Sequence, residues 1–343
     1  MGFSSFRNPM PFPGITVIVG KNDTGKTGLL KLMYTLGKTN ELYVRKKENA
    51  IGEPNYKKIL SEKFFGVFQP RKSGLGDLVR KNANDKLSVQ IKYANDSVTS
   101  LNFGDATTNS IVDVQADTAI NKNINYIFIP AKEVLTAFNS IKAMSQTYFY
   151  PGFDDTYTDL IDLLNIPTQK EILEAHFEEA NKHLTSMFGG ELTQIDSQDR
   201  FVFRRGNIEF AMQLTAEGIK RIGILATLMK NKQLSDSTVL FMDEPETCLH
   251  PSAIREMVDM LVSLSTTGVQ LFLTTHNYFI LKQLHIAARR EQCDILCCSL
   301  ERNKAYDIDS TFANLRETFP DNSIVEESLK MYDEDVKLDL GIK

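Results

Sequence analysis

The chain contains Gly20-Lys21-Asn22-Asp23-Thr24-Gly25-Lys26-Thr27 directly after the apolar run Ile15-Thr16-Val17-Ile18-Val19. The apolar run is typical of a buried strand, and the residues that follow Thr27 are typical of a helix. A strand, a glycine-rich turn and a helix N-terminus aim several backbone N–H groups at one anion. The stretch therefore predicts a phosphate cradle for a nucleoside triphosphate. The less favoured alternative is a glycine-rich loop with a structural role only.

Side-chain chemistry suggests a role for each position of the cradle. Gly20 and Gly25 allow the backbone its tight path. The ammonium of Lys26 can reach the β- and γ-phosphates, and the hydroxyl of Thr27 can ligate Mg²⁺. The other positions expected to contact the nucleotide are Asn22, Asp23, Thr24 and Gly28.

Two acids end a second apolar run, which reads Val239-Leu240-Phe241-Met242-Asp243-Glu244-Pro245. We expect Asp243 to hold the magnesium ion, directly or through water. Glu244 is then placed to polarise the attacking water, because phosphoryl transfer needs a positioned base. A strand that ends in solvated acids is the plainer alternative, and the phosphate cradle upstream argues against it.

A third apolar strand, from Val269 to Leu273, is followed by Thr274-Thr275-His276. A histidine in such a place is often a core residue with a satisfied ring. Open α/β sheets, however, bind ligands at the carboxyl ends of their strands, which makes His276 a candidate γ-phosphate sensor. The predicted catalytic residues are thus Lys26, Glu244 and His276.

The order of these motifs resembles the ABC-type ATPase head, with its Walker A, Q-loop, signature, Walker B and switch-histidine motifs. Gln69 matches the Q-loop, and Thr215-Ala216-Glu217-Gly218 matches the signature. The resemblance implies an α/β fold of the P-loop NTPase class and ABC-ATPase type, with a mostly parallel core sheet, an antiparallel β-subdomain and a helical insertion. It implies ATP and Mg²⁺ as cofactors. It also implies Gln69 as a ligand of metal and nucleotide, and Glu217 and Gly218 as nucleotide contacts supplied across a head-to-tail homodimer.

More narrowly, four segments resemble the prokaryotic AAA family ATPases, which are related to the heads of the overcoming-lysogenization-defect nucleases, the RecF repair protein and the SMC proteins. The segments are Phe128-Ile129-Pro130-Ala131-Lys132-Glu133, Ala216-Glu217-Gly218-Ile219-Lys220-Arg221, Asp243-Glu244-Pro245-Glu246 with Leu249-His250-Pro251, and Thr275-His276-Asn277. Ala216 stands where the family has a signature serine, so either Thr215 or the backbone at Glu217 and Gly218 must take its role, or the contact across the dimer is weak. His250 stands near the usual D-loop aspartate.

Composition is that of an ordinary globular protein: 343 residues, 42% hydrophobic, 24% charged and a net charge of −5. The negative net charge argues against a protein that binds nucleic acid through its overall charge. We find neither an apolar stretch long enough to span a membrane nor a signal-peptide core, and we expect a cytoplasmic protein without a membrane partner.

Cys293, Cys297 and Cys298 lie in a stretch typical of a strand, and their spacing favours small buried thiols over a zinc site.

Four regions are expected within one ABC-type domain: a P-loop lobe with a β-subdomain (1–133), a helical insertion (134–190), a lobe with signature, Walker B and switch histidine (191–310), and a C-terminal helical tail (311–343). Alternating apolar residues predict hairpins around Asn95-Asp96 and around Gly206-Asn207. A short helical seam is predicted from Leu173 to Met187, without the heptads of a coiled-coil arm. Further helices are predicted after Pro251 and around residues 325–332.

For two sets of charged residues the sequence leaves both a functional and a structural interpretation open. Lys132 and Glu133 follow a strand and are either functional or, more commonly, a solvated pair. Basic clusters form either a composite groove for nucleic acid or scattered solubilising charge. They are Arg71-Lys72, Arg80-Lys81, Arg204-Arg205, Lys220-Arg221 and Arg289-Arg290.

The resemblance favours an ATP-driven dimerisation switch in prokaryotic phage defence or genome maintenance. No cluster of acids typical of a nuclease follows His276, so we expect ATP hydrolysis without nuclease activity in this chain. A separate effector, a nuclease or a toxin, is then the expected partner. The alternative is a DNA-repair ATPase of RecF type that acts directly on DNA. The energy subunit of a membrane transporter is disfavoured by the degenerate signature and the large insertion.

Overall fold

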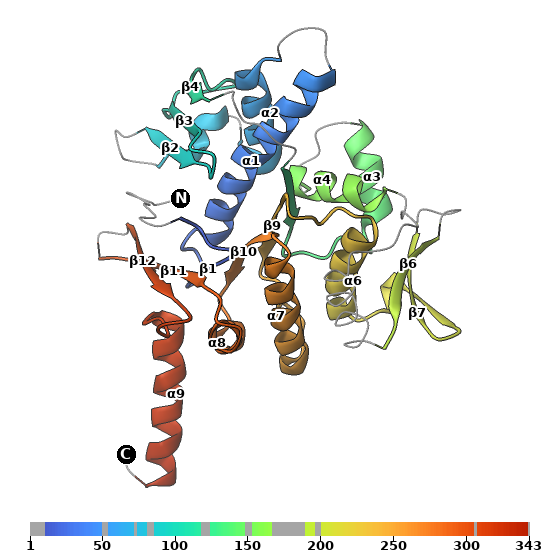
Figure 1. Ribbon diagram of the computed structural model, residues 1–343. Coiled ribbons are helices and arrows are strands. Elements are labelled where there is room, and N and C mark those ends of the chain that lie inside the picture. Colours follow the sequence, from blue (N-terminus) through green and yellow to red (C-terminus); the bar gives the residue numbers. More distant parts are fainter. Residues whose placement is uncertain are drawn as a thin grey trace.

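The computed structural model describes residues 11–49, 54–71, 74–80, 86–117, 124–147, 153–166, 189–195, 200–304 and 307–341. A six-stranded sheet in the order β12-β11-β1-β10-β9-β5 lies at its centre, with helices on both faces (Figure 1). Neighbouring strands are parallel except β11 and β12. The strands are β1 (Ile15–Gly20), β5 (Asn125–Ile129), β9 (Thr238–Asp243), β10 (Gln270–Thr275), β11 (Ile295–Arg302) and β12 (Ile308–Asn314). The predicted mostly parallel core sheet is confirmed.

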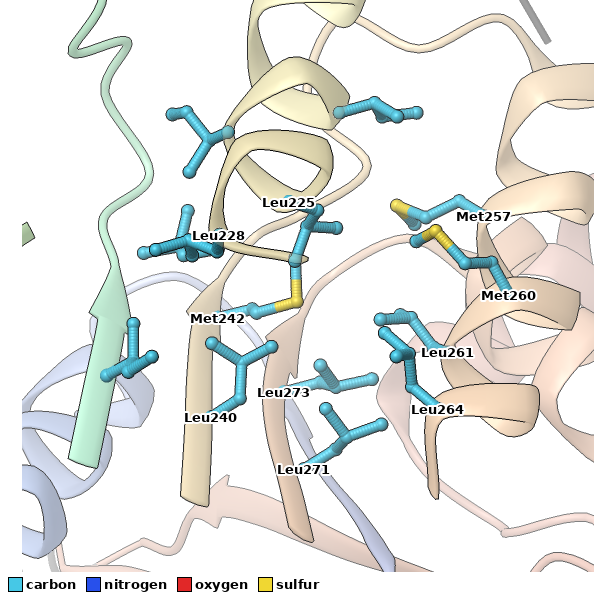
Figure 2. Close-up of a cluster of buried hydrophobic side chains, with 14 of the residues drawn as sticks. Leu225, Leu228, Leu240, Met242, Met257, Met260, Leu261, Leu264, Leu271 and Leu273 are labelled. Atoms are coloured by element: carbon cyan, nitrogen blue, oxygen red, sulfur yellow. The ribbon is translucent and has the colours of Figure 1, made fainter. Parts of the chain in front are cut away.

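Alternation along the buried strands sends successive side chains to opposite faces of the sheet. Leu240 and Met242 of β9 join one hydrophobic cluster, with Leu271 and Leu273 of β10. Figure 2 shows these side chains with leucines and methionines of α6 (Glu217–Lys230) and α7 (Pro251–Thr266), which cover this face. Helix α8 (Tyr278–Arg290) also contributes to the cluster.

The opposite face carries a row of aromatic rings under α1 (Lys26–Asn49). The ring of Phe241 stacks on Phe272 at 5.2 Å and on Phe128 at 6.4 Å, so the row crosses three adjacent strands. Tyr34 of α1 meets Phe128 and Phe241 edge-on. Such pairs contribute about 0.5–1.5 kcal/mol each beyond their burial. The row therefore fixes the helix that begins at the P-loop against the strands that carry the acids.

Two small antiparallel sheets accompany the core. In the first, β2, β3 and β4 pack with α1, α2 and the short helix η1 into a hydrophobic cluster of their own. The second consists of β6, β7 and β8, followed by the short helix η2. Both predicted hairpins are confirmed, and each gains a third strand. The bounds are α2 (Tyr56–Phe68), η1 (Gly74–Leu78), β2 (Leu87–Lys92), β3 (Val98–Phe103), β4 (Asp113–Ala116), β6 (Glu191–Ile195), β7 (Arg200–Arg205), β8 (Ile208–Ala211) and η2 (Met212–Leu214).

The described part of the expected insertion is helical, with α3 (Phe138–Thr147) and α4 (Asp155–Leu164). The predicted seam from Leu173 to Met187 lies outside the described residues. The helix after Pro251 is confirmed as α7, and the tail helix as α9 (Ser323–Asp339). Strand β12 crosses the expected boundary at 310/311, so the first residues of that tail belong to the core sheet.

The cysteine prediction needs one correction. Cys297 and Cys298 are buried in β11, where burial raises the pKa of both thiols, that of Cys297 to about 12. Cys293 precedes the strand and is only partly buried, because β11 begins at Ile295. Within the described ranges, no helix has both the length and the apolar character needed to cross a bilayer.

Gly37 lies where α1 crosses β5, and we predict that Gly37→Ala destabilises the protein. A Cβ at Gly37 would lie 2.2 Å from two atoms of the Tyr126 ring, which is itself buried. Overpacking of this kind costs about 1–3 kcal/mol, more than the roughly 1 kcal/mol that alanine gains over glycine within a helix. The free energy of unfolding in urea should fall by about 1–2 kcal/mol. Gly104→Ala is the control, since nothing lies within 4 Å of its Cβ position.

Candidate nucleotide site

The P-loop adopts a path that requires glycine at its first position. Gly20 has φ 156°, and a Cβ there would lie 2.5 Å from the carbonyl oxygen of Leu300 in β11. Gly25 has φ 83°, in the left-handed region that favours glycine. The hydroxyl of Thr24 donates to the carbonyl of Lys21 at 2.9 Å and closes the turn. The loop is thus held in one conformation between β1 and α1.

Lys26 begins α1 and is almost completely buried. Its ammonium donates to the carbonyls of Gly20 at 2.8 Å and Lys21 at 3.0 Å. Burial lowers the pKa of Lys26, while the carboxylates of Glu244, Asp243 and Glu246 act in the opposite direction. A buried cation beside three acids, at the mouth of an anion cradle, is suited to bind phosphate oxygens.

Oxygen atoms from three elements converge at the carboxyl edge of the sheet. The hydroxyl of Thr27, in α1, donates to the Asp243 carboxylate at 2.9 and 3.1 Å. The hydroxyl of Thr274, at the end of β10, donates to the same carboxylate at 2.6 Å. Mg²⁺ prefers such hard oxygen donors and takes few of them from the protein, leaving the rest to water and phosphate. The residues present therefore fit a magnesium ion held by Thr27 and Asp243, as predicted from the sequence.

Glu244 is held in a conformation that few side chains adopt. Its φ is 47°, in the left-handed region. Its backbone N–H donates to the carbonyl and the hydroxyl of Thr274 at 3.2 and 3.1 Å. Its carbonyl accepts from the Arg221 guanidinium at 3.2 Å and from the Thr247 hydroxyl at 2.9 Å. Such a backbone conformation costs about 1–3 kcal/mol and persists only where surrounding contacts stabilise it. These hydrogen bonds fix the backbone of Glu244 and thereby the position from which its carboxylate extends.

His276 contacts Glu244, a contact that the sequence did not predict. Its Nδ1 lies 2.9 Å from a carboxylate oxygen of Glu244, and the imidazole is half-exposed. Glu246 lies deeper, where its carboxylate accepts from the Thr275 hydroxyl and burial raises its pKa. The predicted catalytic pair Glu244 and His276 thus lies at one edge of the sheet.

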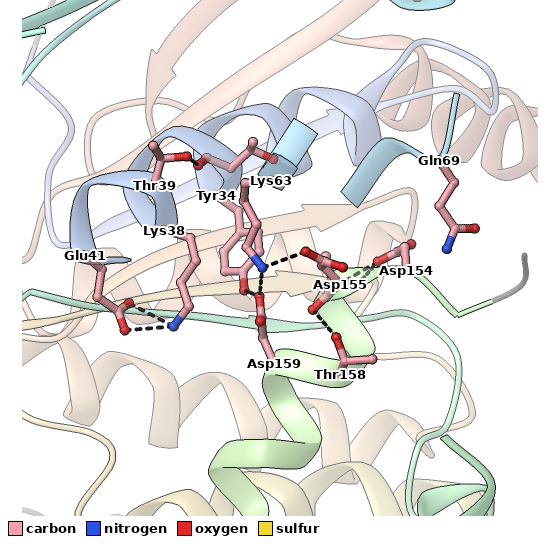
Figure 3. A network of polar contacts seen from close by, with 12 residues as sticks. Tyr34, Lys38, Thr39, Glu41, Lys63, Gln69, Asp154, Asp155, Thr158 and Asp159 are labelled. Atoms are coloured by element: carbon pink, nitrogen blue, oxygen red, sulfur yellow. Dashed lines mark hydrogen bonds and ion pairs between the residues drawn. The ribbon is translucent and has the colours of Figure 1, made fainter. Parts of the chain in front are cut away.

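Gln69 lies at the C-terminal end of α2, with φ 44°. Its side-chain amide donates to the carbonyl of Phe153 at 3.0 Å, just before α4. The structure therefore places Gln69 against the helical insertion (Figure 3), and its role as a metal ligand stays a prediction.

A network of ion pairs around the buried Lys63 joins α4 to α1 and α2 beside Gln69 (Figure 3). The ammonium of Lys63 lies 2.8 Å from Asp155 and 2.7 Å from Asp159. Tyr34 donates to Asp159, and Lys31 pairs with Asp154 at 2.5 Å. Burial lowers the pKa of Lys63, but the two carboxylates outweigh it and keep the pKa above its usual value. The nucleotide-binding helix, the Gln69 loop and the insertion are therefore linked through charged groups.

The signature segment packs against the loop that follows Glu244. Gly218 approaches Leu249 so closely that a Cβ would lie 2.6 Å from its side chain. Thr215 donates its hydroxyl to the carbonyl of Ala211 at 2.9 Å, so that hydroxyl is engaged within the chain. Ala216 and Glu217 are exposed at the start of α6. Of the two substitutes for the missing signature serine, this geometry favours the backbone at Glu217 and Gly218.

Asp23 is fixed by a residue that the sequence did not single out. The Arg302 guanidinium, at the end of β11, donates to the Asp23 carbonyl at 2.7 Å and to its carboxylate at 2.8 Å. Asn22 is exposed beside it. Thr274, Arg221 and Arg302 were missed because each acts through neighbours that only the folded sheet brings together.

The other charged candidates are mostly paired or solvated. Lys132 is exposed, and the Glu133 carboxylate accepts the N–H of Thr136 at 3.0 Å. Many cations of the basic clusters contact carboxylates or carbonyls of this chain. The ion pairs are Arg80 with Asp307, Arg204 with Glu209, Lys220 with Glu217, and Arg290 with Asp259. This pairing favours solubilising charge over a composite groove for nucleic acid.

Comparisons with known proteins agree with this geometry. A family model described as "AAA domain, putative AbiEii toxin, Type IV TA system" matches residues 15–282. Over 74 residues the chain is 39% identical to the Old nuclease of Escherichia phage P2, a match that covers 21% of this chain and 13% of the nuclease. The chain therefore corresponds to a small part of that relative.

The fold is similar to that of solved SMC heads. One is an SmcHead bound to the C-winged helix domain of ScpA, with a TM-score of 0.52 and 14% identity over 92% of this chain and 96% of that one. Another is an Smc head domain with an extended coiled coil, bound to the C-terminal domain of ScpA derived from Pyrococcus furiosus. Its TM-score is 0.50, with 13% identity over 98% of both chains. At these identities the likeness shows an SMC-head-like α/β fold.

We predict that Lys26→Ala weakens Mg-ATP binding by about 10- to 100-fold, because a charge-assisted contact contributes about 1.5–3 kcal/mol. Titration with a fluorescent ATP analogue measures the change. Lys21→Ala is the matched control, since Lys21 lies in the same loop with an exposed side chain. Unchanged affinity of the Lys26 variant would show that the nucleotide binds elsewhere.

Proposed function

Because the chain belongs to the AAA-domain family whose model spans residues 15–282, we propose that it binds and hydrolyses Mg-ATP and uses this cycle as a dimerisation switch. The observation that carries the proposal is the convergence of Lys26, Thr27, Asp243, Glu244 and His276 at one edge of the sheet. A structural glycine loop would have no need of a buried lysine, a hydroxyl–carboxylate pair and a constrained acid together.

Each residue has a chemical task in this proposal. The backbone N–H groups of the P-loop and the Lys26 ammonium bind the phosphates. Thr27 and Asp243 hold Mg²⁺, which offsets the negative charge of the β- and γ-phosphates when bound. Glu244 orients the attacking water and accepts its proton, while His276, 2.9 Å from Glu244, contacts the γ-phosphate.

A second copy would complete the site with its signature segment. Ala216 and Glu217 are exposed at the start of α6, and the neighbouring Leu214 is 80% exposed. An exposed apolar residue beside free helix N–H groups is suited to contact a second copy across a bound nucleotide. In this scheme ATP joins the two copies and hydrolysis releases them, which makes the cycle a population switch.

The output of the switch is proposed to be a separate effector, a nuclease or a toxin, acting in phage defence. The family description supports an effector of this kind, because it mentions a toxin and a toxin–antitoxin system.

We predict that Glu244→Gln traps the ATP-bound dimer, because the amide keeps the geometry of the carboxylate but cannot accept a proton. Turnover should fall by about 10²–10⁴-fold. Size-exclusion chromatography with light scattering should show a larger oligomeric state at saturating Mg-ATP than without nucleotide.

The double variant Lys26→Ala, Glu244→Gln is the control and should stay in its nucleotide-free state. A Glu244→Gln protein that does not change its oligomeric state with ATP would contradict the switch. Tagged Glu244→Gln protein, recovered from its native cells with Mg-ATP, should carry the effector in near-equal amounts. Recovery with DNA alone, together with DNA-stimulated turnover of the unmodified protein, would instead indicate a repair ATPase.

A further inference from the structure

Helix α9 leaves the body of the protein at the edge of the core sheet and projects away from it, with the C-terminus near its tip (Figure 1). Along one side it exposes an apolar row with spacings of three and four residues, which we name the α9 stripe. Its members are Leu329, Tyr332 and Leu340, which are exposed, and Val336, which is partly buried. Leu329 is 58% and Tyr332 66% exposed. Residues at this spacing share one face of a helix, as in helices that pair with another helix.

The flanks of the α9 stripe are acidic. Asp335 and Asp339 follow Tyr332 by three and seven positions, so they lie along one edge of the stripe. The whole helix carries six carboxylates and two lysines. A partner surface that fits this side of α9 would therefore have an apolar row bordered by positively charged residues.

Helix α8 exposes such a row. Phe279 and Ile286, seven positions apart, are 60% and 44% exposed, although the opposite side of α8 is buried against the sheet. Lys282 and Arg289 each follow one of these residues by three positions and border the row with positive charge. We name these four residues the α8 stripe. The sequence of α8 contains no acidic residue.

Within one copy, the base of α9 is fixed so that its far half points away from the α8 stripe. Asn322 caps α9 by accepting the N–H groups of Ile324 and Val325, both at 3.1 Å, and donates to Ser299 of β11. Phe319, just before α9, packs against His285, and the Lys282 ammonium lies 4.7 Å from its ring. These contacts set the direction of α9 and leave Phe279, Ile286 and Arg289 of the α8 stripe exposed.

We propose that α9 of one copy docks on the α8 stripe of a second copy, and that the contact is reciprocal. Apolar rows of the same periodicity would pack together, and the acidic border of one would meet the basic border of the other. A symmetric dimer makes this contact twice, as an isologous interface requires. It would form without nucleotide, and so it is independent of the ATP-dependent contact of the proposed function.

Charge reversal tests the docking. Lys282→Glu with Arg289→Glu makes the α8 stripe acidic, and Asp335→Lys with Asp339→Lys makes the border of α9 basic. Light scattering without nucleotide should show a dimer for the unmodified protein. Each reversed protein should dimerise at least about tenfold more weakly, because like charges then face each other. An equimolar mixture of the two reversed proteins should dimerise again, since each opposes the other with complementary charge.

Glu327→Lys with Glu334→Lys is the matched control, because it reverses two charges on the other side of α9. It should leave the dimer unchanged. A monomeric unmodified protein without nucleotide would overturn the proposal and assign the α9 stripe to a different partner. A dimer that resists both reversals, or a mixture that stays monomeric, would also overturn it. With Glu244→Gln added, both reversed proteins should still dimerise on Mg-ATP, which separates this interface from the nucleotide-dependent one.

Discussion

The Asp243 carboxylate accepts hydrogen bonds from Thr27 and Thr274, and the rest of the site is arranged around these contacts. They join the first turn of α1 to the ends of β9 and β10, although Thr27 and Asp243 are 216 positions apart in the chain. Thr274 also accepts a hydrogen bond from the backbone N–H of Glu244, the residue after Asp243, whose φ lies in the left-handed region. One carboxylate thus connects the phosphate cradle with the base.

Much of this arrangement could be predicted from the sequence, because the chemistry of the P-loop and of the Asp243-Glu244 pair is local. The family match confirms the predicted AAA-domain family, a 74-residue segment is similar to the phage Old nuclease, and the fold is similar to that of SMC heads. Thr274 escaped notice because nothing in the sequence indicates that β10 lies between β1 and β9. The third strand of each small sheet was missed as well. In β4, Asp113-Val114-Gln115-Ala116 is too short and too polar for a strand signal.

For Gln69, the role that the resemblance implies differs from the contact that the structure shows. The resemblance assigns this residue to the metal, whereas the structure places its amide on the loop that enters α4. Around it, Lys63, Asp155 and Asp159 form a network whose partners come from separate helices. Lys63 is itself buried, so loss of either carboxylate would leave its charge less compensated. A movement of the Gln69 loop would therefore have to carry α4 with it.

The position of β1 in the sheet has a consequence for biosynthesis. The strand that precedes the P-loop pairs with β10 and β11, where the partners of Ile15 are Leu271 and Ile295, 256 and 280 positions later in the chain. During synthesis, both edges of β1 stay unpaired until β10 and β11 have emerged from the ribosome. Contacts so distant in sequence slow folding, and unpaired strand edges favour aggregation. The nascent protein is therefore most dependent on chaperones during elongation, and its nucleotide-binding ability should arise late, after synthesis has passed β11.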